Sequence, residues 1–130
     1  MSDVICLRPR ADFDAVEVAP PEGLEIAYCA PGDADLAERM ASARALVIPA
    51  VGPALPAALF RGTALRLVQI TGAGLDRVDR AVLAEEGIAL ANVPGGSNAA
   101  VAEYVTANAI ALSRGFFAAS GPLRAGEYVS

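Results

Sequence analysis

The stretch Leu67–Glu103 constrains the fold most, because it alternates apolar runs with segments of helical spacing. Leu65–Thr71 is an apolar run that predicts a buried strand, and a turn with two glycines, Gly72 and Gly74, follows it. Apolar residues at helical spacing predict a helix over Asp76–Glu86, and the next apolar run predicts another strand. Strands apolar on both faces that alternate with helices predict a parallel sheet covered on both sides.

The rest of the chain extends this pattern towards the N-terminus. Asp33 or Asp35 caps a predicted helix that ends at Ala43, and Pro53–Phe60 predicts a second, short helix. The alternation as a whole predicts an α/β fold, namely a flavodoxin-like, doubly wound parallel sheet of about five strands. Ligands on such sheets bind at the carboxyl ends of the strands. The predicted strands are Val4–Leu7, Leu24–Cys29, Ala45–Ile48, Leu65–Thr71 and Ile88–Val93.

A long apolar helix follows the last predicted strand. Ser97 or Asn98 caps it, it extends to about Ala119, and Gly121-Pro122 ends it. This helix has almost no polar face, so its surface must be covered on several sides. One small sheet is not enough for that, and the sequence therefore predicts contact with a second domain, a second subunit, or both.

Composition excludes several classes of function. With 55% hydrophobic and 19% charged residues the chain can bury a core, and its net charge of −5 argues against nucleic acid or an anionic membrane as a partner. Glu103, Asn108 and Arg114 interrupt the most apolar segment, so we expect no membrane span and a cytoplasmic protein. Cys6 and Cys29 lie in predicted strands and are expected to be buried thiols. Without histidine or a third cysteine, no zinc site is expected.

The glycine turn admits three interpretations. Gly72 and Gly74 match the start of a dinucleotide fingerprint, but the third glycine is replaced by Arg77 and the next strand ends in Asn92 instead of an acid. The glycines can also simply permit a tight turn. In the third interpretation the turn presents backbone N–H groups to an anion at a helix N-terminus, with Asp76 as the helix cap and Asp79 as a first-turn acid.

Two motifs, TGAGLDRVD and NVPGGSNAAVAEY, lie in this order about 25 residues apart along the chain. Together they resemble the D-isomer-specific 2-hydroxyacid dehydrogenases, the NAD-linked family of phosphoglycerate and D-lactate dehydrogenases. The resemblance spans roughly residues 46–130. It implies that the backbone amides of Ala73 and Gly74 hold the substrate carboxylate. It also implies that Ser97 or Asn98 approaches the substrate and that Val101 lies near the nicotinamide of the cofactor.

The resemblance also implies a division of the chain. Residues 1–97 correspond to the substrate-binding domain, and residues 98–130 correspond to the inter-domain helix and the start of an NAD-binding domain. In the family this helix packs against a second subunit, so we expect a homodimer through residues 97–119. The loop that follows the third strand, Pro49–Gly52, is apolar where many relatives carry a polar substrate contact.

The family's catalytic Arg, Glu and His and its G-x-G-x-x-G motif have no counterpart in these residues, and the sequence contains no histidine. We therefore expect no catalytic residue in this chain. The expected role is the substrate-binding portion of an NAD- or NADP-dependent enzyme that acts on a small D-2-hydroxy or 2-oxo acid, with little cofactor binding by residues 1–130 alone. The alternative is a truncated, non-catalytic module with a packing or binding role. The sequence leaves open which acid is used and which of the two cofactors.

Overall fold

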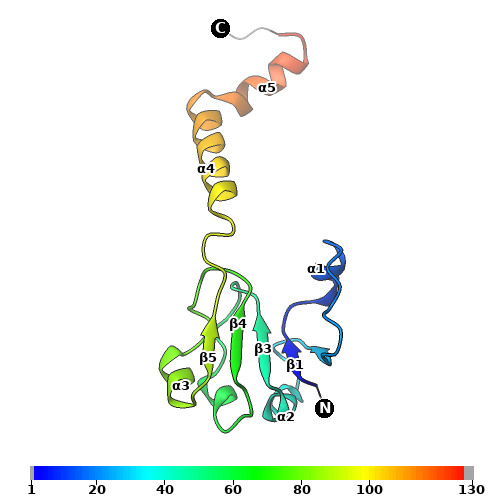
Figure 1. Ribbon diagram of the computed structural model, residues 1–130. Coiled ribbons are helices and arrows are strands. Elements are labelled where there is room, and N and C mark those ends of the chain that lie inside the picture. The colour runs from blue at the N-terminus through cyan, green and yellow to red at the C-terminus, as the bar shows by residue number, and fades with distance from the viewer. Residues whose placement is uncertain (1, 128–130) are drawn as a thin grey trace. The chain divides into compact units, whose positions relative to one another are not determined.

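The computed structural model describes residues 2–127, and its contacts divide the chain into two compact units, Met1–Pro94 and Gly95–Ser130. The first unit contains every strand, and the second consists of helices (Figure 1).

The first unit is a five-stranded, fully parallel sheet in the order β2-β1-β3-β4-β5. This order and the helical connections confirm the predicted flavodoxin-like α/β fold. The apolar runs form strands at the predicted places, though most strands are shorter than predicted. They are β1 (Val4–Cys6), β2 (Ile26–Tyr28), β3 (Ala45–Ile48), β4 (Leu67–Ile70) and β5 (Ala89–Ala91).

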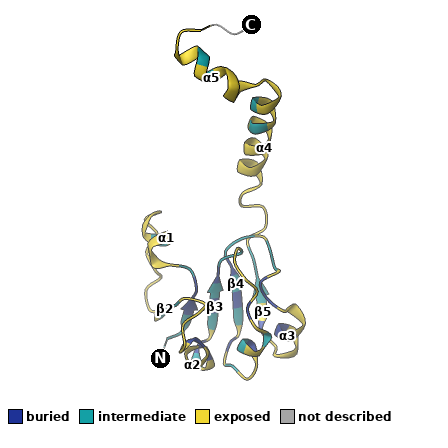
Figure 2. Ribbon diagram, turned by 180° about the vertical axis from the view of Figure 1, so that it is seen from behind, coloured by how far each residue is buried: buried dark blue, intermediate teal, exposed yellow. Residues whose placement is uncertain are grey.

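The core lies on one face of this sheet. Alternate residues of β3 and β4 are fully buried there, while their neighbours on the other face are only half-buried, as the period of two in a strand requires (Figure 2). The helices α2 (Leu36–Ser42) and α3 (Arg80–Glu85) and the 3₁₀ helix η1 (Ala57–Phe60) contribute side chains to this core. The largest buried apolar side chains are Ile5, Met40, Leu46, Ile48, Phe60, Val68, Ile70 and Leu83.

Two elements near the strands differ from the prediction. The segment 53–60 forms only the 3₁₀ helix η1, because Pro53 and Pro56 restrict the residues before them to extended backbone. A short helix, α1 (Arg10–Asp14), follows β1 where no helix was predicted. It is exposed, and i,i+4 ion pairs between arginine and aspartate side chains support it.

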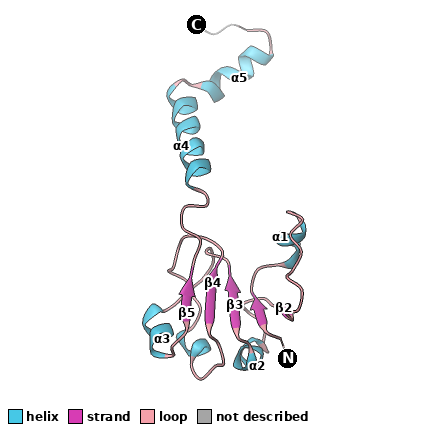
Figure 3. Cartoon of the chain, viewed as in Figure 1, coloured by secondary structure: helices cyan, strands magenta, loops and turns pink. Residues whose placement is uncertain are grey.

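The second unit contains two helices, α4 (Asn98–Ser113) and α5 (Phe116–Arg124), so the prediction of one helix over 97–119 was wrong (Figure 3). The interruption is Gly115, whose φ of 61° is a left-handed conformation that ends a helix. Gly121-Pro122 does not end α5, because the residues beyond Pro122 still donate to helical carbonyls. No helix formed by residues 2–127 is long and apolar enough to span a membrane.

Candidate functional site

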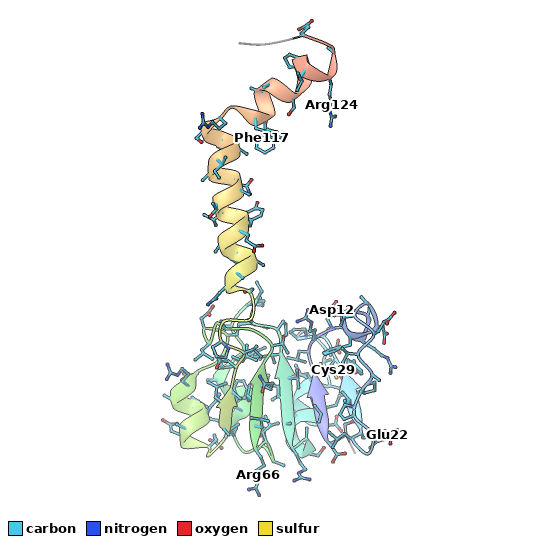
Figure 4. The ribbon with its side chains drawn as sticks, turned by 45° about the horizontal axis from the view of Figure 1, so that its top comes forward. Asp12, Glu22, Cys29, Arg66, Phe117 and Arg124 are labelled. Carbon is cyan, nitrogen blue, oxygen red and sulfur yellow. The ribbon has the colours of Figure 1, made fainter. Side chains whose placement is uncertain are left out.

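All five strands are parallel, so the loops that follow them meet at one edge of the sheet. Figure 4 shows the two ends of the first unit. Asp12, which follows β1, lies at the edge where strands end, and Arg66, which precedes β4, lies at the opposite edge. The predicted carboxylate loop, residues 71–74, belongs to the first of these edges.

Neighbouring strands hold this loop in place on both sides. The N–H and the hydroxyl of Thr71 both donate to the carbonyl of Ile48 at the end of β3, at 2.8 and 3.3 Å. On the other side, the N–H of Val93 donates to the carbonyl of Gly72 (2.9 Å), and Asn92 Nδ2 donates to the carbonyl of Ala73 (2.9 Å). The loop therefore has a defined backbone conformation.

The amides of the loop are its available donors. Among the described residues, the N–H groups of Ala73 and Gly74 donate to no backbone or side-chain acceptor. Ala73 is exposed and Gly74 is half-buried. A backbone N–H without a protein acceptor needs water or a ligand, and two such groups on consecutive residues leave two donors for one anion.

The close spacing of neighbouring atoms, and not an unusual backbone angle, distinguishes the two glycines, since neither has a positive φ. A Cβ added to Gly72 would lie 2.6 Å from the Cβ of Ala50, in the loop after β3. A Cβ added to Gly74 would lie 2.9 Å from the Oδ1 atom of Asp76. A glycine at position 72 therefore lets the loops after β3 and β4 pack closely together.

The helix after the turn begins later than predicted, at Arg80. Its cap is Asp79, whose Oδ1 accepts hydrogen bonds from the N–H groups of Ala81 (2.9 Å) and Val82 (3.2 Å). The assignment of Asp76 as the cap and of Asp79 as a first-turn acid was therefore wrong. The free N–H groups of Ala73 and Gly74 are consequently not at a helix N-terminus, so the dipole of α3 does not favour an anion beside them.

Arg77 is the residue that sequence analysis missed. It is 1% exposed, yet no carboxylate pairs with it in the described residues. Its guanidinium instead donates to three carbonyls of the loop after β3, those of Pro49 (2.8 Å), Val51 (3.2 Å) and Pro53 (2.9 Å). Arg77 therefore fixes the apolar Pro49–Gly52 loop from inside. The available signal was its position, where a dinucleotide motif requires glycine.

These contacts also test whether the loop fits a dinucleotide. The buried Arg77 side chain occupies the position of the third glycine, and the next helix starts only at Arg80. A pyrophosphate needs a glycine-lined approach to a helix N-terminus, which residues 72–80 do not provide. The residues of this loop do not fit NAD or NADP.

The other predicted site residues belong to the second unit. Ser97 occupies the N-cap position of α4 without a side-chain capping bond, and Asn98 is the first residue of the helix. Val101 donates its N–H to the carbonyl of Ser97 (2.9 Å), and its side chain is 55% exposed. Ala73 and Gly74 thus belong to the first unit, and Ser97, Asn98 and Val101 belong to the second.

The two cysteines are free, as expected, but differ in burial. Cys6 is buried in β1, and desolvation raises the pKa of its thiol. Cys29 is only half-buried, which corrects the prediction for that residue, and desolvation raises its pKa as well. In residues 2–127, no group of three or more His, Cys, Asp or Glu side chains is arranged to hold a metal ion.

Comparison with known proteins places this geometry in a family. The family model of the D-isomer specific 2-hydroxyacid dehydrogenase catalytic domain matches residues 4–125. The chain belongs to this family. The family resemblance predicted from the two motifs is thereby confirmed.

Individual members of the 2-hydroxyacid dehydrogenase family are similar over different lengths. An erythronate-4-phosphate dehydrogenase of Tolumonas auensis is 34% identical over 92 residues, which are 70% of this chain and 25% of that protein. A 2-hydroxyacid dehydrogenase structure from Ketogulonicigenium vulgare Y25 has a TM-score of 0.76 and 27% identity, covering 97% of this chain and 41% of that one. The D-lactate dehydrogenase of Treponema pallidum shares the fold, with a TM-score of 0.69, 21% identity, and coverage of 97% and 40%. The chain therefore spans about a quarter of the curated relative and two fifths of the solved structures.

Proposed function

We propose that the chain is the substrate-binding portion of an NAD(P)-dependent oxidoreductase that acts on the CH–OH group of a D-2-hydroxy acid. In the complete enzyme the same site reduces the corresponding 2-oxo acid by hydride transfer. In this proposal, residues 1–94 bind the acid, and the helices of residues 95–130 lead to the part of the enzyme that binds the cofactor.

One observation carries the proposal. The loop of residues 71–74 is held by β3 on one side and by the segment after β5 on the other, and it leaves the N–H groups of Ala73 and Gly74 without protein acceptors. A carboxylate has two oxygens, and each can accept a hydrogen bond from one of two adjacent N–H groups. These backbone donors bind the carboxylate without a positively charged side chain. The fixed backbone means that the donors are oriented before the acid arrives, which lowers the entropic cost of binding.

The remaining chemistry needs groups that residues 1–130 do not supply. Removing the hydroxyl proton requires a base such as histidine, and the sequence has none. The loop around Arg77 does not fit the cofactor, so we assign the hydride carrier to another part of the complete enzyme. Ser97, Asn98 and Val101 remain proposed contacts, the first two for substrate and Val101 for the nicotinamide. The free thiols of Cys6 and Cys29 support a reducing compartment, and we propose the cytoplasm.

We also propose that the second unit mediates a homodimer. Neither α4 nor α5 buries a single side chain, and both carry large apolar residues that are more than half exposed. Many large apolar side chains left exposed on two successive helices indicate an interface. The side chains concerned are Tyr104, Val105, Ile110, Leu112, Phe116, Phe117 and Leu123.

The binding function can be tested by thermal unfolding of residues 1–130 with D-glycerate, glyoxylate or glycerol. The first two carry the carboxylate and glycerol does not. Ligand at ten times its Kd stabilises by about 1.4 kcal/mol, which raises Tm by several degrees for a domain of this size. We expect both acids to raise Tm and glycerol to leave it unchanged. Equal stabilisation by glycerol, or none by either acid, contradicts the proposal.

A further inference from the structure

Arg8 reaches the carboxylate loop from a distant part of the sheet. It follows β1, and its Nη1 atom donates to Oγ1 of Thr71 at 3.2 Å, although 63 residues separate the two. In the strand order β3 lies between β1 and β4, so the side chain must cross two strand spacings, about 10 Å. The guanidinium of Arg8 therefore lies over the end of β3, beside residues 71–74.

The guanidinium retains donors for a ligand. Its Nε atom donates to Oδ2 of Asp12 at 2.8 Å, and Nη1 is used by Thr71. Nη2 has no hydrogen-bond acceptor in residues 2–127, and the side chain is 37% exposed. A planar fork with unused N–H groups matches the two oxygens of a phosphate or carboxylate. Asp12, labelled in Figure 4, orients this fork at the carboxyl edge of the sheet.

Four other arginines of the first unit lack this combination of position and available donors. Arg44 and Arg66 immediately precede β3 and β4, and so lie at the opposite edge. Arg77 is buried and donates to three carbonyls. Arg10 lies close in sequence, but it pairs with Asp14 at 3.6 Å and its Cζ lies 5.9 Å from the ring centroid of Tyr28. Of these five arginines, only Arg8 has both the position at the loop and free donors.

We propose that Arg8 is a specificity-determining residue that binds a second anionic group of the substrate. This inference rests on the proposed function: the carboxylate of the acid occupies the amides of Ala73 and Gly74, and Arg8 contacts a phosphate or second carboxylate at the other end. The substrate class is then a D-2-hydroxy acid with two anionic groups. The two contacts come from the loops after two different strands, β1 and β4. They therefore select an acid by the distance between its two anionic groups as well as by its charge.

The test compares three acids on ¹⁵N-labelled residues 1–130 at constant ionic strength. D-glycerate has one anionic group, D-malate has a second carboxylate, and D-3-phosphoglycerate has a phosphate. Dissociation constants come from titration of the amide signals. We expect the wild type to bind at least one of the doubly anionic acids about 10-fold or more tightly than D-glycerate, since a hydrogen bond between charged groups contributes that much. Which of the two acids is preferred distinguishes phosphate from carboxylate.

Variants separate this role from a structural one. R8A and R8Q are expected to lose the preference for the doubly anionic acids over D-glycerate. Their Kd for D-glycerate is expected to stay within about two-fold of the wild-type value. R8K is expected to keep part of the preference. R8Q removes the charge but keeps a polar side chain that can still donate to Asp12, so it reports on charge even if R8A folds poorly. R10A removes a neighbouring charge and is expected to keep the preference, since Arg10 pairs with Asp14 instead.

Two results would overturn the inference in different ways. If R8Q weakens all three acids equally, Arg8 only supports the loop and selects nothing. If no acid shifts the amide signals of Ala73 and Gly74 in the wild type, the proposed carboxylate site itself is wrong.

Discussion

A Cβ atom on Gly72 would lie 2.6 Å from the Cβ of Ala50, closer than real Cβ contacts occur. The loops after β3 and β4 are therefore in direct contact at this glycine, and the position of the Ala73 and Gly74 amides depends on that contact. Ala50 has no flexible atoms that can move aside, whereas the atom that opposes Gly74 is the end of the Asp76 side chain.

Gly72→Ala is expected to destabilise the fold by about 1–3 kcal/mol, the usual cost of an overpacked site. Gly74→Ala is expected to cost less, because Asp76 can rotate. Gly32→Ala is the matched control, because a Cβ there meets nothing within 4 Å and φ is not positive. Urea unfolding of the three variants gives the ranking, and a Gly72→Ala variant as stable as Gly32→Ala would contradict the close contact.

Arg77→Met is expected to lower the free energy of unfolding by about 2–4 kcal/mol, because it leaves the carbonyls of the loop after β3 without their donor. Arg77→Lys should fall between this variant and the wild type, since one ammonium cannot reproduce the planar fork. The control is Arg80→Met at an exposed position, with an expected change within about 0.5 kcal/mol. Equal stabilities of Arg77→Met and Arg80→Met would show that the buried guanidinium does not hold the loop.

Asp79→Ala is expected to cost about 1 kcal/mol, since it removes the two capping bonds to Ala81 and Val82. Asp76→Ala removes no cap of α3 and should cost less. Chemical unfolding of both variants decides between the two. A larger loss of unfolding free energy for Asp76→Ala would indicate that Asp76 is the cap, as the sequence predicted, and that the helix starts nearer the glycine turn.

If the chain dimerises through the second unit, a charged residue introduced into that interface should disrupt the dimer. Val105→Glu or Phe117→Glu is expected to shift sedimentation at micromolar concentration towards the monomer, because an unpaired carboxylate in an apolar interface is costly. Val16→Glu, at an exposed valine of the first unit, is the control and should remain dimeric. A wild type that sediments as a single monomeric species would remove the dimer proposal.

Purified residues 1–130 are expected to show no NAD- or NADP-dependent turnover of any 2-hydroxy acid, since the sequence contains no histidine and the loop around Arg77 does not fit a dinucleotide. Absorbance at the reduced nicotinamide band measures this directly. Turnover that co-purifies with the chain and persists in a preparation free of other dehydrogenases would assign a catalytic base to these residues.

The sheet was predictable because its strands are apolar runs with turn residues between them. The core face of α2 followed from helical spacing, and Leu36, Met40 and Ala43 are all buried as predicted. The end of α4 was missed, although Gly115 was visible in the sequence, because the identity of a glycine does not reveal its φ.

The candidate site was predictable only in part. Gly72 and Gly74 identified the loop, but the choice between Asp76 and Asp79 as the cap depends on Arg77 and Val78 turning inward, which is a tertiary effect. Arginine is rarely buried, so nothing in its identity indicated the role of Arg77. The contact between Arg8 and Thr71 joins residues 63 positions apart, and no local pattern encodes it.

The most direct test of the central claim is an NMR titration of ¹⁵N-labelled residues 1–130 with D-glycerate. We predict that the amide signals of Ala73 and Gly74 shift most and that both shifts saturate with the same dissociation constant. The amide signal of Gly32, on another loop, should stay unchanged. If the acid leaves the Ala73 and Gly74 signals in place, whether or not it shifts others, these amides do not hold a substrate carboxylate.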